Sequence, residues 1–207
     1  MPYGTLSIDA ISTSGNLAVT GNVAITGNVT VSGNITANGV ITGSAGDIYP
    51  LVISTEKNST SGTSVDFSNI PSWVKRVTLM FEGVSTSGSS NYLIQIGDAS
   101  GISTTGYVSA GSTINTTVAS SSSTAGFIIR ISAADGAGTI MTGSLVLTHW
   151  GGNKWICHGL MSAGTSTPST MTTTGSKTLT SALTTVRATT VNGSDTWDLG
   201  KINILYE

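Results

Sequence analysis

Charge is scarce in this chain. Only 9% of its 207 residues are Asp, Glu, Lys or Arg, and the formal net charge is −2. No basic run occurs, which argues against nucleic-acid binding through neutralised phosphates. Low charge indicates disorder only where apolar content is also low. Here 38% of the residues are hydrophobic and alternate along short runs, which is typical of a β-protein with Thr- and Ser-rich faces.

Cysteine and long apolar runs are equally scarce. The single cysteine, Cys157, has no partner in its own chain and is expected to pack as a small hydrophobe. No apolar run reaches the length of a transmembrane helix, so we expect no membrane insertion. Residues 1–13 lack the apolar core of a signal peptide, which predicts synthesis and folding in a cytoplasm.

A repeated hexad occupies residues 15–44, with the pattern Gly, Asn, apolar, small, apolar, Thr or Ser. Because six is an even number, an extended chain keeps the same residues on the same face from one hexad to the next. One face is polar, and the other is apolar with recurring glycines, which suit close approach between backbones. The apolar positions are Leu17, Val19, Val23, Ile25, Val29, Val31 and Ile35.

The apolar face of the hexads needs a partner that buries it. Five hexads are too few for a single-chain β-helix, which needs several stacked turns. A hairpin meander with a turn at each Gly-Asn is the alternative, but its strands of about four residues would lack a packing partner. Three copies wound about a threefold axis would bury the face. We therefore predict an intertwined homotrimeric stalk whose core consists of these apolar residues.

The rest of the chain predicts an all-β domain. We expect a virion-attachment leader over residues 1–14, the stalk over 15–46 with a linker at its end, and a C-terminal head over 47–207. No window of 11 residues has a convincing helical period. Regular short strands with Gly-, Ser- and Asn-rich turns predict an antiparallel β-sandwich or barrel of the jelly-roll kind. The strands are expected at 49–54, 64–68, 74–84, 92–97, 107–109, 127–133, 139–150, 155–161, 183–191 and 199–206.

Several predicted strands are apolar on both faces. Val77 and Leu79 share one face of their strand, while Met80 lies on the other. Trp155 and Cys157 likewise alternate with Ile156. The outer face of a lone sandwich should be polar, so this pattern indicates that neighbouring protomers cover part of it.

Four segments carry a resemblance to a known family. They are the opening Met-Pro-Tyr-Gly-Thr-Leu-Ser-Ile-Asp, the hexads, the block 63–85 followed by Asn-Tyr-Leu-Ile-Gln-Ile-Gly at 91–97, and the closing stretch 193–207. Together they resemble the short tail-fibre proteins of tailed bacteriophages, including those of cyanobacterial and marine hosts. The resemblance implies a homotrimer whose N-terminus binds a tail or other virion protein and whose C-terminal sandwich faces the host. It supplies no catalytic motif.

Constellations that carry chemistry are missing from the sequence. Asp195 and Asp198 flank Trp197 in a predicted turn, and turn-forming hydrogen bonds explain them better than a glycosidase pair does. His149 and His158 could each meet their copies on a threefold axis and hold a metal, but a hydrogen-bonded structural role is favoured. We therefore expect no enzyme activity, no catalytic residues, no cofactor and no metal.

Three functions compete on this basis. The first is a virion tail fibre that binds a host-surface receptor, with a glycan expected. The second is a structural trimer without a receptor, such as a capsid decoration or tail adaptor fibre, and the third is a small polysaccharide-degrading enzyme. Loops should make any receptor contact, and two aromatic residues that border loops could stack on sugars while neighbouring polar residues bind hydroxyls. The resulting candidates are Asn91, Tyr92, Asp98 and Tyr107.

Overall fold

The computed structural model describes residues 23, 26, 29–33, 41–43, 46–129, 131, 137–164 and 168–207. The chain divides into two units, Met1–Ile41 and Thr42–Glu207. The second unit, here called the head, is built from antiparallel strands, and the described residues contain no helix. None of the described chain therefore forms a helix of the length and apolar content needed to cross a membrane.

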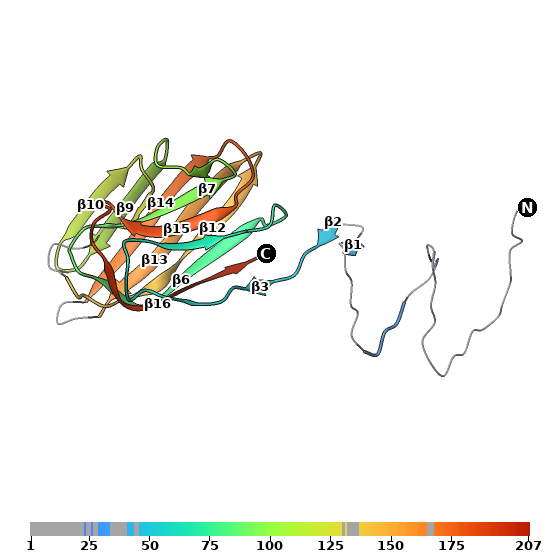
Figure 1. The fold of residues 1–207 in the computed structure, drawn as a ribbon, viewed down its shortest axis with the longest axis horizontal. Helices are drawn as coiled ribbons and strands as arrows, with labels where there is room; N and C mark the ends of the chain where they lie inside the picture. Colours follow the sequence, from blue (N-terminus) through green and yellow to red (C-terminus); the bar gives the residue numbers. More distant parts are fainter. Residues whose placement is uncertain are drawn as a thin grey trace, which may run out of the picture. The chain divides into compact units, whose positions relative to one another are not determined.

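Two antiparallel sheets of unequal width form the head (Figure 1). The larger sheet runs β10-β9-β14-β13-β12-β6-β16-β3, with β4 also paired to β16, and the smaller runs β11-β7-β15-β5, with β8 paired to β7. The larger sheet comprises β3 (Val52–Ile53), β4 (Lys57–Asn58), β6 (Arg76–Thr86), β9 (Val108–Ile114), β10 (Val118–Ser123), β12 (Met141–Gly151), β13 (Lys154–Ala163), β14 (Ser169–Thr178) and β16 (Trp197–Tyr206). The smaller comprises β5 (Val65–Ser68), β7 (Tyr92–Asp98), β8 (Gly101–Ile102), β11 (Phe127–Ile129) and β15 (Thr185–Thr190).

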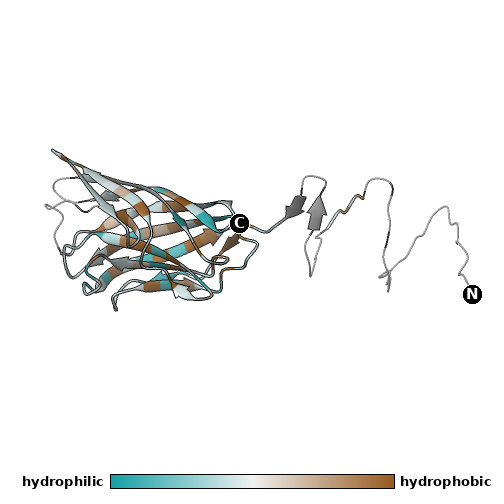
Figure 2. Cartoon of the chain, turned by 90° about the horizontal axis from the view of Figure 1, so that it is seen from above, coloured by the Kyte–Doolittle hydropathy of each residue, from teal (hydrophilic) through white to brown (hydrophobic). Residues whose placement is uncertain are grey.

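The inward positions of both sheets share one apolar core. Leu79 and Leu145 from the larger sheet and Ile94 and Val186 from the smaller are fully buried. Hydrophobic and hydrophilic residues alternate along the strands (Figure 2). Each large aliphatic side chain buried in this way contributes about 1.5 to 3 kcal/mol. Cys157 is buried in this core as a free thiol, as predicted, and burial raises the pKa of that thiol.

Most predicted strands are present, but two segments that lie between the predicted strands also form strands. Residues 120–126 contribute most of β10, and residues 163–177 contribute most of β14. Their composition hides this, because β14 places Ser169, Met171 and Thr173 toward the core and only Met171 is a large apolar residue. A further difference lies at the predicted linker, where β1 (Ile41–Gly43) pairs with β2 (Gly46–Ile48).

Backbone hydrogen bonds sort the loops of the head into two ends. The proximal end is the one that holds Tyr49, whose ring stacks on Trp73 at 5.0 Å. The β5–β6, β7–β9, β12–β13 and β14–β15 connections meet there, linked by bonds such as His149 N–H to Lys75 O and Thr184 N–H to Gly97 O. At the distal end, Ser87 N–H donates to Thr196 O, which joins the β6–β7 and β15–β16 connections.

Candidate functional site

The outer face of the larger sheet is the broadest surface with a distinctive composition. It is formed by the outward positions of the five neighbouring strands β12, β13, β14, β9 and β10. Among those positions only Lys154, at the proximal tip of β13, is charged. Cross-strand register places Leu160, Thr172, Ser112 and Ser120 in one row across this face.

Large apolar side chains are exposed on this outer face. Val108 is 73% exposed, Val118 is 74% exposed, and Leu160 and Ile114 are 60% and 47% exposed. Two open hollows of about 370 and 170 Å³ lie on the face, the first beside Leu160 and His158 and the second beside Ala110 and Ser120. Val118 and Ile114 are direct cross-strand partners, whereas Thr172 and Ser112 lie between them and Leu160, so the face is partly apolar and partly lined by hydroxyl groups.

Two of the predicted receptor contacts, Tyr92 and Tyr107, are core residues. Tyr92 is 1% exposed and packs on Trp197 at 4.9 Å between ring centroids, and burial raises the pKa of its hydroxyl. Tyr107 is 2% exposed and meets Phe127 edge-on, and its hydroxyl accepts a hydrogen bond from Ile96 N–H. Burial raises the pKa of Tyr107 to about 12. The expectation that these two rings stack on a sugar is therefore wrong, because neither has a free face.

Asp98 is a third predicted contact whose carboxylate is already occupied. It lies at the proximal end, 6% exposed. One oxygen accepts hydrogen bonds from the backbone N–H and hydroxyl of Ser100, and the other accepts from the N–H and hydroxyl of Thr180 and from Ser181 N–H. Asp98 therefore joins the β7–β8 turn to the β14–β15 connection, and the expectation that it binds sugar hydroxyls is corrected accordingly.

Asn91 lies at the distal end and is half-buried. Its side-chain oxygen accepts from Ile131 N–H, and its backbone carbonyl accepts from Val191 N–H. Beside it, Asp195 accepts from Ser90 N–H and from the Asn192 amide. These bonds hold the two distal connections against each other, while Asn192 to Ser194 remain exposed. A receptor contact at Asn91 stays a prediction.

The predicted stalk core is described in part. Val23, Val29 and Val31 are 63%, 62% and 46% exposed in the single chain. Apolar side chains in that state remain available to other chains, and their role in a trimer stays a prediction. The other four predicted core residues, Leu17, Val19, Ile25 and Ile35, lie outside the described residues, as does the predicted leader over 1–14.

The groups weighed for chemistry are dispersed in the head. His149 Nε2 lies 2.6 Å from Gly152 O, and because a carbonyl only accepts, Nε2 carries a hydrogen and donates it. His158 is exposed on the outer face of β13. Asp198 accepts from the Ser85 hydroxyl, whereas Asp195 bonds within the distal loops. The described residues hold no group of three or more His, Cys, Asp or Glu side chains that could bind a metal.

One exposed aromatic residue stands apart from the buried ones. Trp150 lies at a β-bulge where β12 turns into β13, and it is 72% exposed. Its place beside Gly151 and Gly152 was the available signal in the sequence, and both glycines have positive φ in the structure. The exposed valines of β9 and β10 carried a weaker signal, because their strands are otherwise Ser- and Thr-rich.

Comparisons with protein-family models, with curated proteins and with solved structures found no match to this chain.

Replacing Asp98 by Asn should destabilise the head, by about 1.5 to 3 kcal/mol at pH 7, because hydrogen bonds to a charged acceptor are lost. The five hydrogen bonds hold the pKa of Asp98 below its usual value of about 3.9. A lowered folded-state pKa stabilises the protein above the unfolded pKa, and this contribution is lost as pH falls through the folded pKa. Urea unfolding should therefore show a difference between the two proteins that is constant above about pH 5 and shrinks below about pH 4. A difference that grows toward low pH would contradict this account.

Proposed function

We propose that the chain is a homotrimeric virion fibre, a tail fibre of a bacteriophage that takes part in recognition of the host surface, with a glycan as the receptor. In this proposal the hexads form the trimeric stalk, the head forms a second trimer contact, and the N-terminus binds a tail or other virion protein. The observation that carries the proposal has two parts. The outer face of the head is partly apolar and has Lys154 as its one charged residue, and the hexads that precede the head in the sequence have one apolar face.

The proposed head is jelly-roll-like, and the strand order supports this assignment. A jelly roll places eight strands in two sheets made of two Greek keys. Here successive segments of the chain alternate between the two sheets. β5, β7, β11 and β15 belong to the smaller sheet, and β6, β9–β10 and β12–β14, which lie between them in the sequence, belong to the larger one. The first strand of this series, β5, pairs with the last, β15. The hairpin β12–β13 is inserted between β6 and β14, and β16 extends the larger sheet beyond β6.

The outer face suits contact between copies better than contact with water. Interface cores are depleted in charge and enriched in apolar residues. Val108, Val118 and Leu160 would lose exposed apolar area there, and the many threonines could bond across the contact. The partner in this proposal is a second and third copy of the chain, because the stalk brings the same three heads together.

The receptor-facing surface in this proposal is the distal end, opposite Tyr49. Its two connections, 87–91 and 191–196, are mostly polar, exposed at their tips and braced by the hydrogen bonds of Asn91 and Asp195. A braced loop loses little conformational entropy on binding. The alternative is a structural trimer without a receptor, such as a capsid decoration or adaptor fibre. The burial of Tyr92 and Tyr107 favours that alternative, because it removes the aromatic platform.

Val29→Asp should abolish the trimer or the order of its stalk. Three carboxylates would meet near a dry axis, and burying such like charges is strongly unfavourable. The matched control is Thr30→Asp on the polar face of the same hexad, which should leave the mass unchanged. Light scattering of the full chain measures the outcome, and an unmutated protein with the mass of one chain would exclude the stalk.

Leu160→Lys should weaken head-to-head contact, because it places three ammonium groups within the proposed contact. Val191→Lys is the matched control, since Val191 is also exposed, at 52%, but lies in a distal loop. We expect the Leu160 variant to bring three heads farther apart in small-angle scattering while the stalk keeps the trimeric mass. Identical scattering curves for the two variants would remove the outer face from the proposed trimer.

The purified full chain should compete with phage particles for adsorption to host cells. Avidity from three heads raises apparent affinity by roughly 10² or more where geometry permits, so the trimer should inhibit at far lower protein concentration than the Val29→Asp protein. Removal of surface polysaccharide from the host should abolish the competition. Absence of competition by a folded trimer would favour the purely structural alternative.

A further inference from the structure

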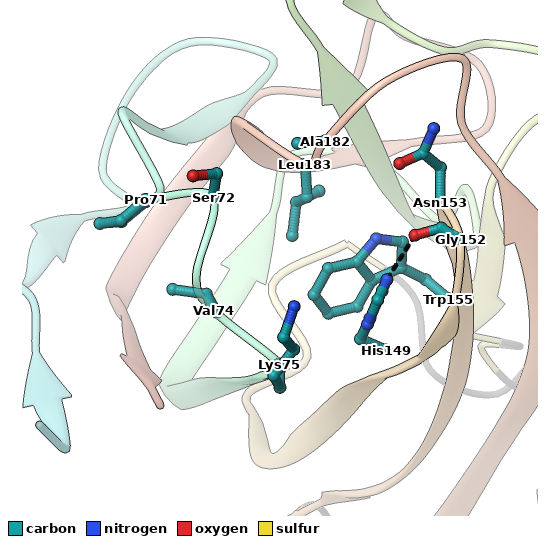
Figure 3. Close-up of a pocket in the computed structure, with 10 residues that line it drawn as sticks. All are labelled: Pro71, Ser72, Val74, Lys75, His149, Gly152, Asn153, Trp155, Ala182 and Leu183. Carbon is teal, nitrogen blue, oxygen red and sulfur yellow. Dashed lines mark hydrogen bonds between the residues drawn. The ribbon is translucent and has the colours of Figure 1, made fainter. Parts of the chain in front are cut away.

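A small hollow lies at the proximal end of the head, between the β5–β6, β12–β13 and β14–β15 connections (Figure 3). Its volume is about 120 Å³. Each of the three connections contributes to its lining, which includes Ser72, Lys75, His149, Asn153, Trp155 and Leu183. Trp155 borders the hollow but is only 3% exposed and packs on the His149 ring, and the ammonium group of Lys75 points into the space (Figure 3).

Lys75 differs from most other cations of the head because it has no partner. Seven Lys and Arg residues lie within the described residues, and five of them pair with a carboxylate or a backbone carbonyl. Those five are Lys57, Arg76, Lys177, Arg187 and Lys201. Among the described residues, only Lys75 and Lys154 have neither an ion pair nor a side-chain hydrogen bond. Of these two, only Lys75 lines the hollow.

The lining of the hollow contains hydrogen-bond donors and no carboxylate. The Asn153 amide donates one hydrogen to Thr180 O at 3.2 Å and retains a second. The Ser72 hydroxyl is exposed and is free to donate. Two acidic side chains at the proximal end are already engaged, since Glu207 pairs with Arg76 and Asp98 accepts five hydrogen bonds from Ser100, Thr180 and Ser181. An anion entering the hollow would therefore meet an unneutralised positive charge.

We propose that this hollow binds the carboxylate of an acidic sugar. Pockets for drug-sized ligands measure about 300 to 1,000 Å³, so this one suits a single charged group and part of one ring. Lys75 would pair with the carboxylate, and Asn153 and Ser72 would bind hydroxyls of the ring. A hollow this short has no extended groove for a peptide backbone. The inference goes beyond the proposed function, because the hollow lies at the proximal end of the head whereas the proposed receptor-facing surface is the distal end.

The test is a ligand-observed NMR titration of the full chain with D-galacturonate, D-galactose and acetate. We expect galacturonate to bind with a dissociation constant of about 1 mM and galactose to bind at least about tenfold more weakly, because it lacks the charge. Lys75→Gln should weaken galacturonate binding by about tenfold or more. Its backbone bonds to Glu207 and His149 remain possible in that variant, so the fold is expected to persist.

Lys154→Gln is the matched control, since it removes an unpaired charge near the same end but outside the hollow. Its affinity should stay within about twofold of the unmutated protein. Equal losses in the two lysine variants, or equal binding of galactose and galacturonate, would overturn the inference. Acetate binding as tightly as galacturonate would overturn the assignment to a sugar.

The outcome is separable from that of the proposed function. A trimer that competes for host adsorption but does not distinguish galacturonate from galactose overturns the carboxylate subsite and leaves the fibre proposal standing. A protein that binds galacturonate through Lys75 but neither trimerises nor competes for adsorption supports the subsite and overturns the fibre proposal.

Discussion

The structure depends on one apolar core shared by two antiparallel sheets. A chain with a single cysteine cannot cross-link itself, so burial between the sheets must offset the entropy of ordering the head. Each strand gives alternate positions to this core, and rings such as Tyr92, Trp197 and Phe127 fill the largest volumes. Aromatic residues that border loops in the sequence are drawn into the core for this reason, since their area contributes most when buried.

The unequal widths of the two sheets determine what remains outside. The larger sheet buries its inner face against the smaller one, whereas its outer face over β12, β13, β14, β9 and β10 stays open. Thr and Ser on that face suit β-strands without adding charge, so the sheet stays regular while remaining able to pack against another surface. The same composition makes the face harder to recognise in the sequence than in the structure.

The strands of the head could be predicted from the sequence where they are rich in apolar residues. The candidate site could be predicted only in part. The apolar residues of β6, β7 and β13 predicted those strands closely. In β10 and β14 the inward positions are filled by Ser, Thr and a few larger residues. The inward and outward positions therefore have similar hydrophobicity, and no period-2 pattern marks these strands in the sequence. Proximity of Tyr107 to a loop did not reveal its burial, because a one-residue step in a strand reverses which face a side chain occupies. Which loops lie at the same end of the head depends on how strands far apart in the sequence pair, and local sequence patterns do not contain that information.

Because charged residues are scarce, the three proposed contact surfaces differ in the interactions that they can offer. Five of the seven described cations are paired within the head, so neither the outer face nor the distal loops offer a strong field to a partner. Contacts there rest on shape, apolar burial and neutral hydrogen bonds, which salt affects little. The hollow beside Lys75 holds an exposed, unpaired charge, so an ion pair formed there would be screened by salt. Association of copies through the outer face should therefore tolerate ionic strength, whereas recognition of an anion at the proximal end should weaken with it.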